Sequence, residues 1–275
     1  MNKYLSLIFV MLLGLSANAQ HKLEKIWETD SIINMPESVL ADTKAGVLYV
    51  SIMGNSANAK DGIGGIGKLD INGKVINLDW ITGLNSPKGL AIHGNKLYVA
   101  DLTDVVVIDI LKSKVELTIP IAGSSFLNDI TVSDKGVVYV SDSRTKKIHQ
   151  ITNNKDVVYL ENIDGVNGLK AIGSDLYIAG GGKNLLKADA KKELIKIAGL
   201  AFGGDGIEPI GNGDFLFSSW SGYVYYVFAN GTSELLLDTH LEKKNTADIG
   251  YDPVKKIVYI PTFFKKSVMA YQLKL

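Results

Sequence analysis

Short apolar runs follow one another along the chain, separated by polar turns rich in glycine, asparagine and aspartate. In one stretch of about thirty residues the runs are 129–132, 136–141, 147–151 and 157–160. The turns between them include Asp134-Lys135-Gly136 and Asn153-Asn154-Lys155, both typical of tight connections between strands. No segment keeps a helical period over about twelve residues. The pattern predicts a chain built from short antiparallel strands.

The strands belong to a repeat. An apolar run containing an aromatic residue occurs six times, at 47–50, 96–99, 137–140, 175–178, 214–217 and 257–260. A shorter element precedes each copy, and its first residues are Glu37, Lys88, Asn128, Asn167, Asp205 and Ala247. A period near forty residues with four strands per period is typical of propellers. The sequence therefore predicts an all-β, six-bladed β-propeller with four antiparallel strands per blade; a seven-bladed ring or a β-sandwich are the alternatives.

The two ends of the repeat complement each other. The last copy ends with its third strand, at 268–273, and has no fourth. The segment 23–28 is a strand without a blade, with apolar residues at Leu23, Ile26 and Trp27. We expect this segment to pair into the last blade, closing the ring and covering open strand edges.

The first nineteen residues have the pattern of an export signal. A short basic start with Lys3 precedes the apolar run 5–15, and small residues follow at 16–19. The apolar run is too short to span about 30 Å of hydrocarbon, and no later run is long enough. We predict a signal peptide at 1–19, cleaved after Ala19, and a single propeller domain at 20–275. The mature protein would be periplasmic or secreted, with no membrane span.

Composition narrows the chemistry. The 29 basic and 29 acidic residues give a formal net charge of zero, which argues against nucleic acid as a partner. The chain has no cysteine, so disulfides, thiolate catalysis and cysteine-bound metals are excluded.

One column of the repeat carries candidate chemistry. Equivalent residues on the innermost strands of a propeller converge on its central channel. The first residues of the six short elements, from Glu37 to Ala247, should therefore meet at one mouth of the channel, and we call them the first column. The residues next to them in the chain are Ser38, Gly89, Asp129, Gly168, Gly206 and Asp248. Carboxylate and amide oxygens suit hard divalent cations. The alternative is a wet channel mouth whose polar groups are only solvated or bonded to each other.

Four short motifs resemble those of the senescence-marker-protein/gluconolactonase family. They are Pro36-Glu37-Ser38, Leu127-Asn128-Asp129, Val166-Asn167-Gly168-Leu169 and Gly204-Asp205-Gly206-Ile207. The resemblance implies that Glu37, Asn167 and Asp205 bind one divalent cation, which would be calcium, magnesium, manganese or zinc. It also implies that Asn128 contacts the substrate. Ser38 stands where the family usually has glycine.

The resulting hypothesis is a metal-dependent hydrolase of a lactone or related ester, such as a sugar lactone or an organic acid ester. Asp205, or else Asp129, would act as general base, and Asn128 would orient the substrate. Lys88 would weaken cation binding by repulsion unless it swings away. Its alternative roles are to stabilise an oxyanion, to bind a carboxylate or to pair with Glu37. Loops around the mouth offer Arg144, Lys183, Trp220 and Phe263. The alternative function is a non-catalytic binding propeller with a structural metal or none.

The longest connection, 53–65, explains the widest spacing in the repeat. Its part 53–61 lies on the side of the channel that carries Glu37. It is either a loop that shapes a substrate site or a solvated insertion.

Overall fold

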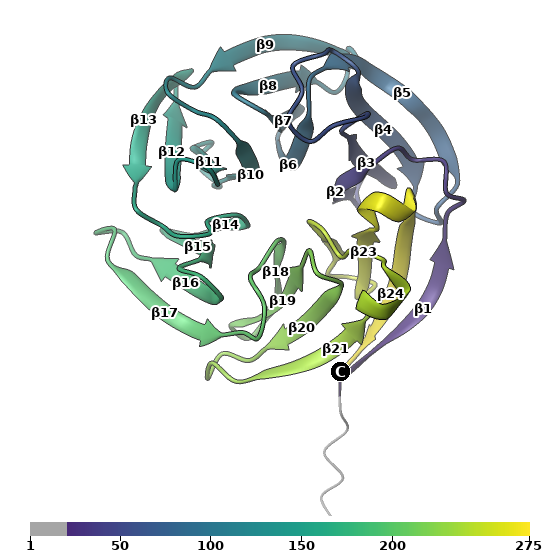
Figure 1. Cartoon of the computed structure of the whole chain (residues 1–275), viewed down its shortest axis with the longest axis vertical. Helices are drawn as coiled ribbons and strands as arrows, with labels where there is room; N and C mark the ends of the chain where they lie inside the picture. The colour runs from purple at the N-terminus through teal and green to yellow at the C-terminus, as the bar shows by residue number, and fades with distance from the viewer. Residues whose placement is uncertain (1–20) are drawn as a thin grey trace, which may run out of the picture.

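A computed structural model describes residues 21–275, and the predicted signal peptide lies outside this range. Six four-stranded antiparallel sheets stand around a common axis, as Figure 1 shows. The prediction of a six-bladed all-β propeller is confirmed. Within 21–275, no helix is long and apolar enough to cross a membrane.

The strands follow the chain from the axis outward in blades 1 to 5. Blade 1 comprises β2 (Pro36–Asp42), β3 (Val47–Ile52), β4 (Gly64–Asp70) and β5 (Val75–Leu84); blade 2 comprises β6 (Pro87–His93), β7 (Lys96–Asp101), β8 (Asp104–Asp109) and β9 (Lys114–Pro120). Blade 3 comprises β10 (Leu127–Val132), β11 (Val138–Asp142), β12 (Lys147–Thr152) and β13 (Lys155–Leu160); blade 4 comprises β14 (Leu169–Ile172), β15 (Asp175–Gly180), β16 (Asn184–Ala188) and β17 (Leu194–Gly199). Blade 5 comprises β18 (Ile207–Gly211), β19 (Asp214–Ser219), β20 (Tyr223–Val227) and β21 (Ser233–Asp238).

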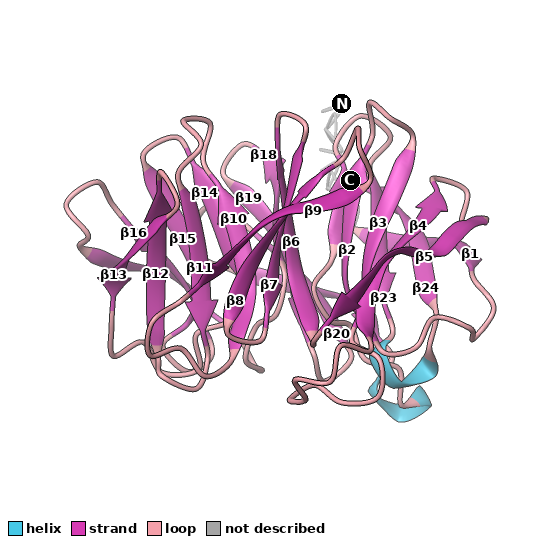
Figure 2. Cartoon of the chain, turned by 90° about the horizontal axis from the view of Figure 1, so that it is seen from above, coloured by secondary structure: helices cyan, strands magenta, loops and turns pink. Residues whose placement is uncertain are grey.

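Blade 6 is built from both ends of the described chain. It contains β22 (Gly250–Asp252), β23 (Ile257–Pro261) and β24 (Val268–Lys274), with β1 (Lys22–Glu28) as its outermost strand. Two short 3-10 helices, η1 (His240–Glu242) and η2 (Phe263–Lys265), lie together at one end of the ring (Figure 2).

The core lies between neighbouring blades. Apolar side chains from the two facing sheets pack together, as Tyr49 and Ile66 of blade 1 do with Leu97 and Val106 of blade 2. The aromatic residue of the repeated run also packs in this core: the rings of Tyr49 and Trp80 are tilted to each other, with centroids 5.1 Å apart. Because every blade contributes both faces, the ring is stabilised as one body by burial of apolar surface.

The first strand closes the ring as predicted. β1 pairs antiparallel with β24, from Lys22 opposite Lys274 to Glu28 opposite Met269. The register shifts between Lys25 and Trp27, which leaves Ile26 as a bulge residue with 48% of its surface exposed. Trp27 instead packs against Tyr259, with ring centroids 5.9 Å apart. Of the apolar residues in this segment, Ile26 therefore does not contribute to the core.

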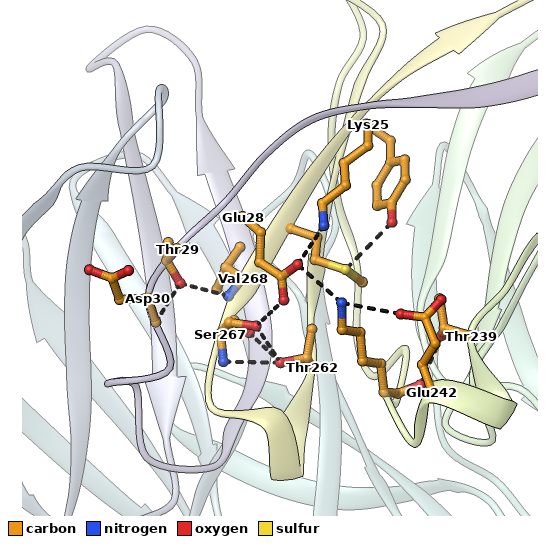
Figure 3. Close-up of polar contacts among 12 residues, drawn as sticks. Lys25, Glu28, Thr29, Asp30, Thr239, Glu242, Thr262, Ser267 and Val268 are labelled. Carbon is orange, nitrogen blue, oxygen red and sulfur yellow. Dashed lines mark hydrogen bonds and ion pairs between the residues drawn. The ribbon is translucent and has the colours of Figure 1, made fainter.

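Hydrogen bonds and ion pairs also stabilise the junction between β1 and β24, as Figure 3 shows. The Glu28 carboxylate accepts hydrogen bonds from Ser267 Oγ at 2.9 Å and from Lys244 Nζ at 3.1 Å. Thr29 donates its backbone N–H to the carbonyl of Val268 at 2.9 Å, and its hydroxyl oxygen accepts from the Val268 N–H at 3.1 Å. These bonds connect the chain leaving β1 to the start of β24, so closure does not depend on the strand ladder alone.

The junction is also bonded at the axis. Asp248 donates its N–H to the carbonyl of Glu37 at 2.9 Å, and Val39 donates to the carbonyl of Asp248 at 3.2 Å. The innermost segments of blades 6 and 1 thus form a short parallel bridge beside the channel.

Acid is expected to weaken the fold through His149 on β12. Its side chain is buried, and neither ring nitrogen has a hydrogen-bond partner; the nearest carboxylate oxygen, of Asp156, is 3.6 Å from Nδ1. Burial lowers the pKa of His149 below its ordinary value of 6.5. Because the folded state binds this proton less readily, the stability conferred by neutral His149 is complete above pH 6.5 and falls as the pH drops below it. Urea unfolding midpoints of the wild type and of His149→Phe between pH 8 and 5 test this, because acidification should destabilise the wild type relative to the variant; the same pH profile in both proteins would contradict it.

Candidate active site

Irregular pairing at the start of the innermost strands positions the first column. In blades 1, 2 and 3 the register shifts between Pro36 and Val39, Pro87 and Leu90, and Leu127 and Ile130. Such bulges release two residues from the ladder and redirect their side chains. Serine hydroxyls on the second strand accept the released N–H groups: Ser51 from Ser38 at 2.8 Å and Ser141 from Asp129 at 2.9 Å. In blades 1 and 3 the backbone that carries Glu37 and Asn128 is thereby fixed beside the first column.

Glycines beside the column let adjacent blades approach closely. A Cβ at Gly168 would lie 1.8 Å from the carbonyl oxygen of Asp205, and one at Gly206 would lie 2.5 Å from the Ile249 nitrogen. Both obstacles are backbone atoms that cannot move aside. The small residue is thus required for blades 4, 5 and 6 to meet at the axis.

The column and its surrounding loops enclose a pocket of about 240 Å³. It is lined by Glu37, Met53, Ala57, Lys88, Phe126, Asn128, Asn167, Asp205, Trp220 and Phe263. Phe263 comes from η2, so the pocket opens at the end of the ring that carries the two 3-10 helices in Figure 2. All three predicted metal ligands, and Asn128 and Lys88, are brought together here.

The predicted ligands present oxygen atoms without partners. Glu37 and Asp205 are only 5% and 2% exposed. Asn167 donates its Nδ2 to Asp205 Oδ1 at 3.0 Å, whereas Asn167 Oδ1 and Glu37 Oε2 are buried with no hydrogen-bond partner. Leaving buried polar atoms unpaired costs about 1–3 kcal/mol each. Both oxygens belong to residues that line the pocket, so a bound water molecule, cation or other ligand could complete their bonding there.

The electrostatics of the buried Glu37 and Asp205 carboxylates also favour a cation at this position. Burial, with the nearby Asp205 and Asp248 carboxylates, raises the pKa of Glu37 well above its usual range; burial and Asp248 do the same for Asp205. A divalent cation would offset this repulsion, and two carboxylates with one amide oxygen form a donor set suited to a hard cation. Within 21–275, no cluster of three or more histidine, cysteine, aspartate or glutamate side chains is placed to hold a metal; the third donor of this set is the amide oxygen of Asn167.

Lys88 is the cationic group of the pocket. It is 1% exposed and donates to Ser86 O at 2.9 Å and Ser86 Oγ at 3.3 Å, with its ammonium 4.3 Å from the centroid of Phe126. Burial lowers its pKa to about 8, although Glu37 and Asp101 oppose this effect. Among residues 21–275 it forms no ion pair within 4.0 Å, so it does not close the mouth by pairing with Glu37.

Asp129 lies apart from this pocket. Its carboxylate accepts the N–H groups of Leu169 and Ile130, and a Cβ at Gly89 would lie 2.4 Å from its Oδ1. Asp129 and Asp248 line a second pocket, of about 340 Å³, at the opposite end of the channel. Asp129 thus contacts blades 2, 3 and 4, whereas Asp205, the other predicted base, lines the first pocket.

The remaining predicted substrate residues divide into two groups. Asn128 donates its Nδ2 to Ser143 Oγ at 3.0 Å within the pocket wall, and Trp220 lines the rim with 43% of its surface exposed. Arg144 does not line the pocket: it donates to Asn58 Oδ1 at 2.8 Å and Ser125 Oγ at 3.1 Å. Lys183 is also absent from the lining and lies beside Phe202.

The long loop after β3 folds against the mouth. Met53 and Ala57 line the pocket, while Asn34 donates to the Gly54 carbonyl at 2.6 Å and Ser86 Oγ to the Ser56 carbonyl at 3.1 Å. With the Arg144–Asn58 bond, these contacts hold 53–58 in place. Its position supports the prediction that this segment shapes a site.

Phe126, which lines the pocket, and Ser86, which accepts the hydrogen bonds of Lys88, are residues that the sequence did not reveal. Both precede a column position and are fixed by an aspartate at the end of a second strand. Asp101 accepts the N–H of Ser86 at 2.6 Å, and Asp142 accepts that of Phe126 at 3.2 Å. The recurrence of aspartate after the aromatic strands of blades 2 and 3 was the available signal.

No family model and no curated protein matches the chain. The fold is similar to that of virginiamycin B lyase from Staphylococcus aureus, solved in a catalytically inactive form with quinupristin (TM-score 0.64, 13% identity, 93% of this chain and 100% of that one). It is also similar to a streptogramin B lyase (0.63, 12%, 93% and 98%) and to a chain of a nidogen/laminin complex (0.61, 16%, 74% and 80%). At these identities the likeness establishes the propeller fold alone.

Proposed function

We propose that the protein is an exported, metal-dependent hydrolase of lactones or related esters, with its active site in the pocket at the mouth of the channel. One observation carries the proposal: side chains from three blades converge there, and two of their oxygens, Glu37 Oε2 and Asn167 Oδ1, are buried without partners. The resemblance of the four column motifs to the gluconolactonase family supports the same reading.

A cation held by Glu37, Asn167 and Asp205 would polarise the substrate carbonyl and acidify a water molecule. Asp205 would accept the proton of the attacking water as general base and return it to the alkoxide oxygen that is released when the acyl C–O bond breaks. Asn128, fixed through Ser143, orients the substrate. Loop 53–58 and the aromatic rim restrict access of bulk water to the ester.

Hydrolysis of a lactone panel tests the proposal. The purified mature protein should hydrolyse at least one lactone or ester when Ca²⁺, Mg²⁺, Mn²⁺ or Zn²⁺ is added. Extraction with a chelator should reduce the rate by at least about 100-fold, and re-addition of the cation should restore it. A rate that survives chelation would contradict the metal-dependent mechanism.

A binding module is the second candidate, because aromatic side chains are exposed beside the same mouth. Trp220 stacks edge-on with Phe263 at 5.5 Å and with Phe264 at 5.9 Å, and both Trp220 and Phe264 are exposed. Exposed apolar clusters often mark interaction sites. A silent lactone panel, together with saturable capture of an exported protein that Trp220→Ala abolishes, would favour this candidate.

A further inference from the structure

Three kinds of chemical group line the pocket: oxygen donors, one ammonium group and apolar side chains. Glu37, Asn167 and Asp205 supply oxygens from blades 1, 4 and 5, and Lys88 supplies one ammonium group from blade 2. The rest of the lining is mainly apolar, formed by Met53, Ala57, Phe126, Trp220 and Phe263.

The ammonium group of Lys88 has one N–H donor that makes no hydrogen bond to another residue of 21–275. An ammonium group carries three N–H donors, and the hydrogen bonds of Lys88 are both to Ser86. The face of Phe126 stabilises the charge without accepting a conventional hydrogen bond. A buried ammonium group without a carboxylate partner is costly, so a ligand anion would complete its bonding.

The charged groups of the pocket determine how many negative charges the ligand would carry. A divalent cation would neutralise the two carboxylates of Glu37 and Asp205, which leaves the single positive charge of Lys88. The pocket would therefore be neutral with one negative charge on the ligand.

The apolar walls define the body of the ligand. Phe263 is buried and meets Trp220 edge-on, so the rim presents ring faces and edges that suit a flat apolar group. A polyhydroxylated sugar would leave hydroxyl groups against these walls without partners. The volume of about 240 Å³ limits the ligand to a small molecule.

We infer that the site selects small lactones or esters that carry one carboxylate and an apolar, preferably aromatic, body, with Lys88 as the residue that binds the carboxylate. This inference rests on the proposed function and deepens it. Of the two substrates expected from the sequence, it favours an organic acid ester or lactone with an aromatic body over a sugar lactone.

Binding without turnover tests the inference. Calorimetric titration with 3-phenylpropionate, 3-phenylpropanamide and gluconate, each with Ca²⁺ present, compares charge and body separately. The wild-type protein should bind phenylpropionate at least about 10-fold more tightly than either of the others, as expected for one charge-assisted hydrogen bond and one buried ring. Equal affinity for the acid and its amide, or tighter binding of gluconate, would overturn the inference without requiring any variant.

Two variants test whether Lys88 is the residue that binds the carboxylate. Lys88→Gln should remove the preference for the acid over the amide. Lys187→Gln, at a half-buried lysine on β16 that pairs with Asp175 outside the pocket, should retain it. Persistence of the preference in Lys88→Gln would overturn the role of Lys88. Lactone hydrolysis without this selectivity would defeat the inference alone; selective binding without any hydrolysis would defeat the proposed function alone.

Discussion

Replacing Asp205 by asparagine is expected to reduce kcat/KM for lactone hydrolysis by about 100- to 10,000-fold. The substitution keeps the shape of the side chain and its position beside Asn167, but removes the carboxylate that would both hold the cation and accept a proton. Initial rates at saturating and limiting substrate, with the cation in excess, measure the loss.

Glu208→Gln provides the matched control. Glu208 lies on β18 in the same blade, three residues after Asp205, but lines the pocket at the opposite end of the channel and pairs with Lys170 at 2.7 Å. Its substitution should leave kcat/KM within about twofold. Undiminished activity in Asp205→Asn, or an equal loss in both variants, would show that Asp205 does not carry the chemistry.

Trp27→Ala should lower the free energy of unfolding by about 2–3 kcal/mol. The Trp27 ring packs on Tyr259 of blade 6 and lies over Gly73, where a Cβ would come within 2.7 Å of it. Trp27 therefore joins blade 6 to blade 1, and the cavity left by alanine would loosen the closure of the ring. Urea unfolding followed by circular dichroism at pH 8 measures the change.

Ile26→Ser distinguishes this effect from damage to the strand itself. Ile26 is the adjacent bulge residue and faces solvent, so its substitution should change stability by less than about 0.5 kcal/mol. A similar loss in both variants would mean that pairing of β1, and not the packing of Trp27, controls closure.

The repeat made the fold and the column predictable. Strand length, turn residues and a period near forty determine how many blades form, and the missing fourth strand of the last copy indicated where 23–28 would pair. The column followed because equivalent positions of a propeller meet at its axis. Ile26 was the exception, since a bulge that shifts register by one residue leaves no mark in the hydrophobic pattern.

The directions of individual side chains and the contacts of the loops could not be predicted in this way. Asn128 and Asp129 are adjacent, yet one lines the site and the other the opposite pocket, because the bulge at the start of β10 determines which way each side chain turns. Phe126 enters the pocket from a connecting segment anchored by Asp142. Arg144 was expected to meet substrate, but its bond to Asn58 depends on the path of a loop that has no counterpart in the other blades.

Diffraction from crystals of the mature protein soaked in MnCl₂ tests the central claim most directly. We expect an anomalous peak in the pocket, coordinated by oxygens of Glu37, Asn167 and Asp205, and its loss in Asp205→Asn. A pocket without anomalous density at saturating Mn²⁺, with Lys88 turned to pair with Glu37, would contradict it.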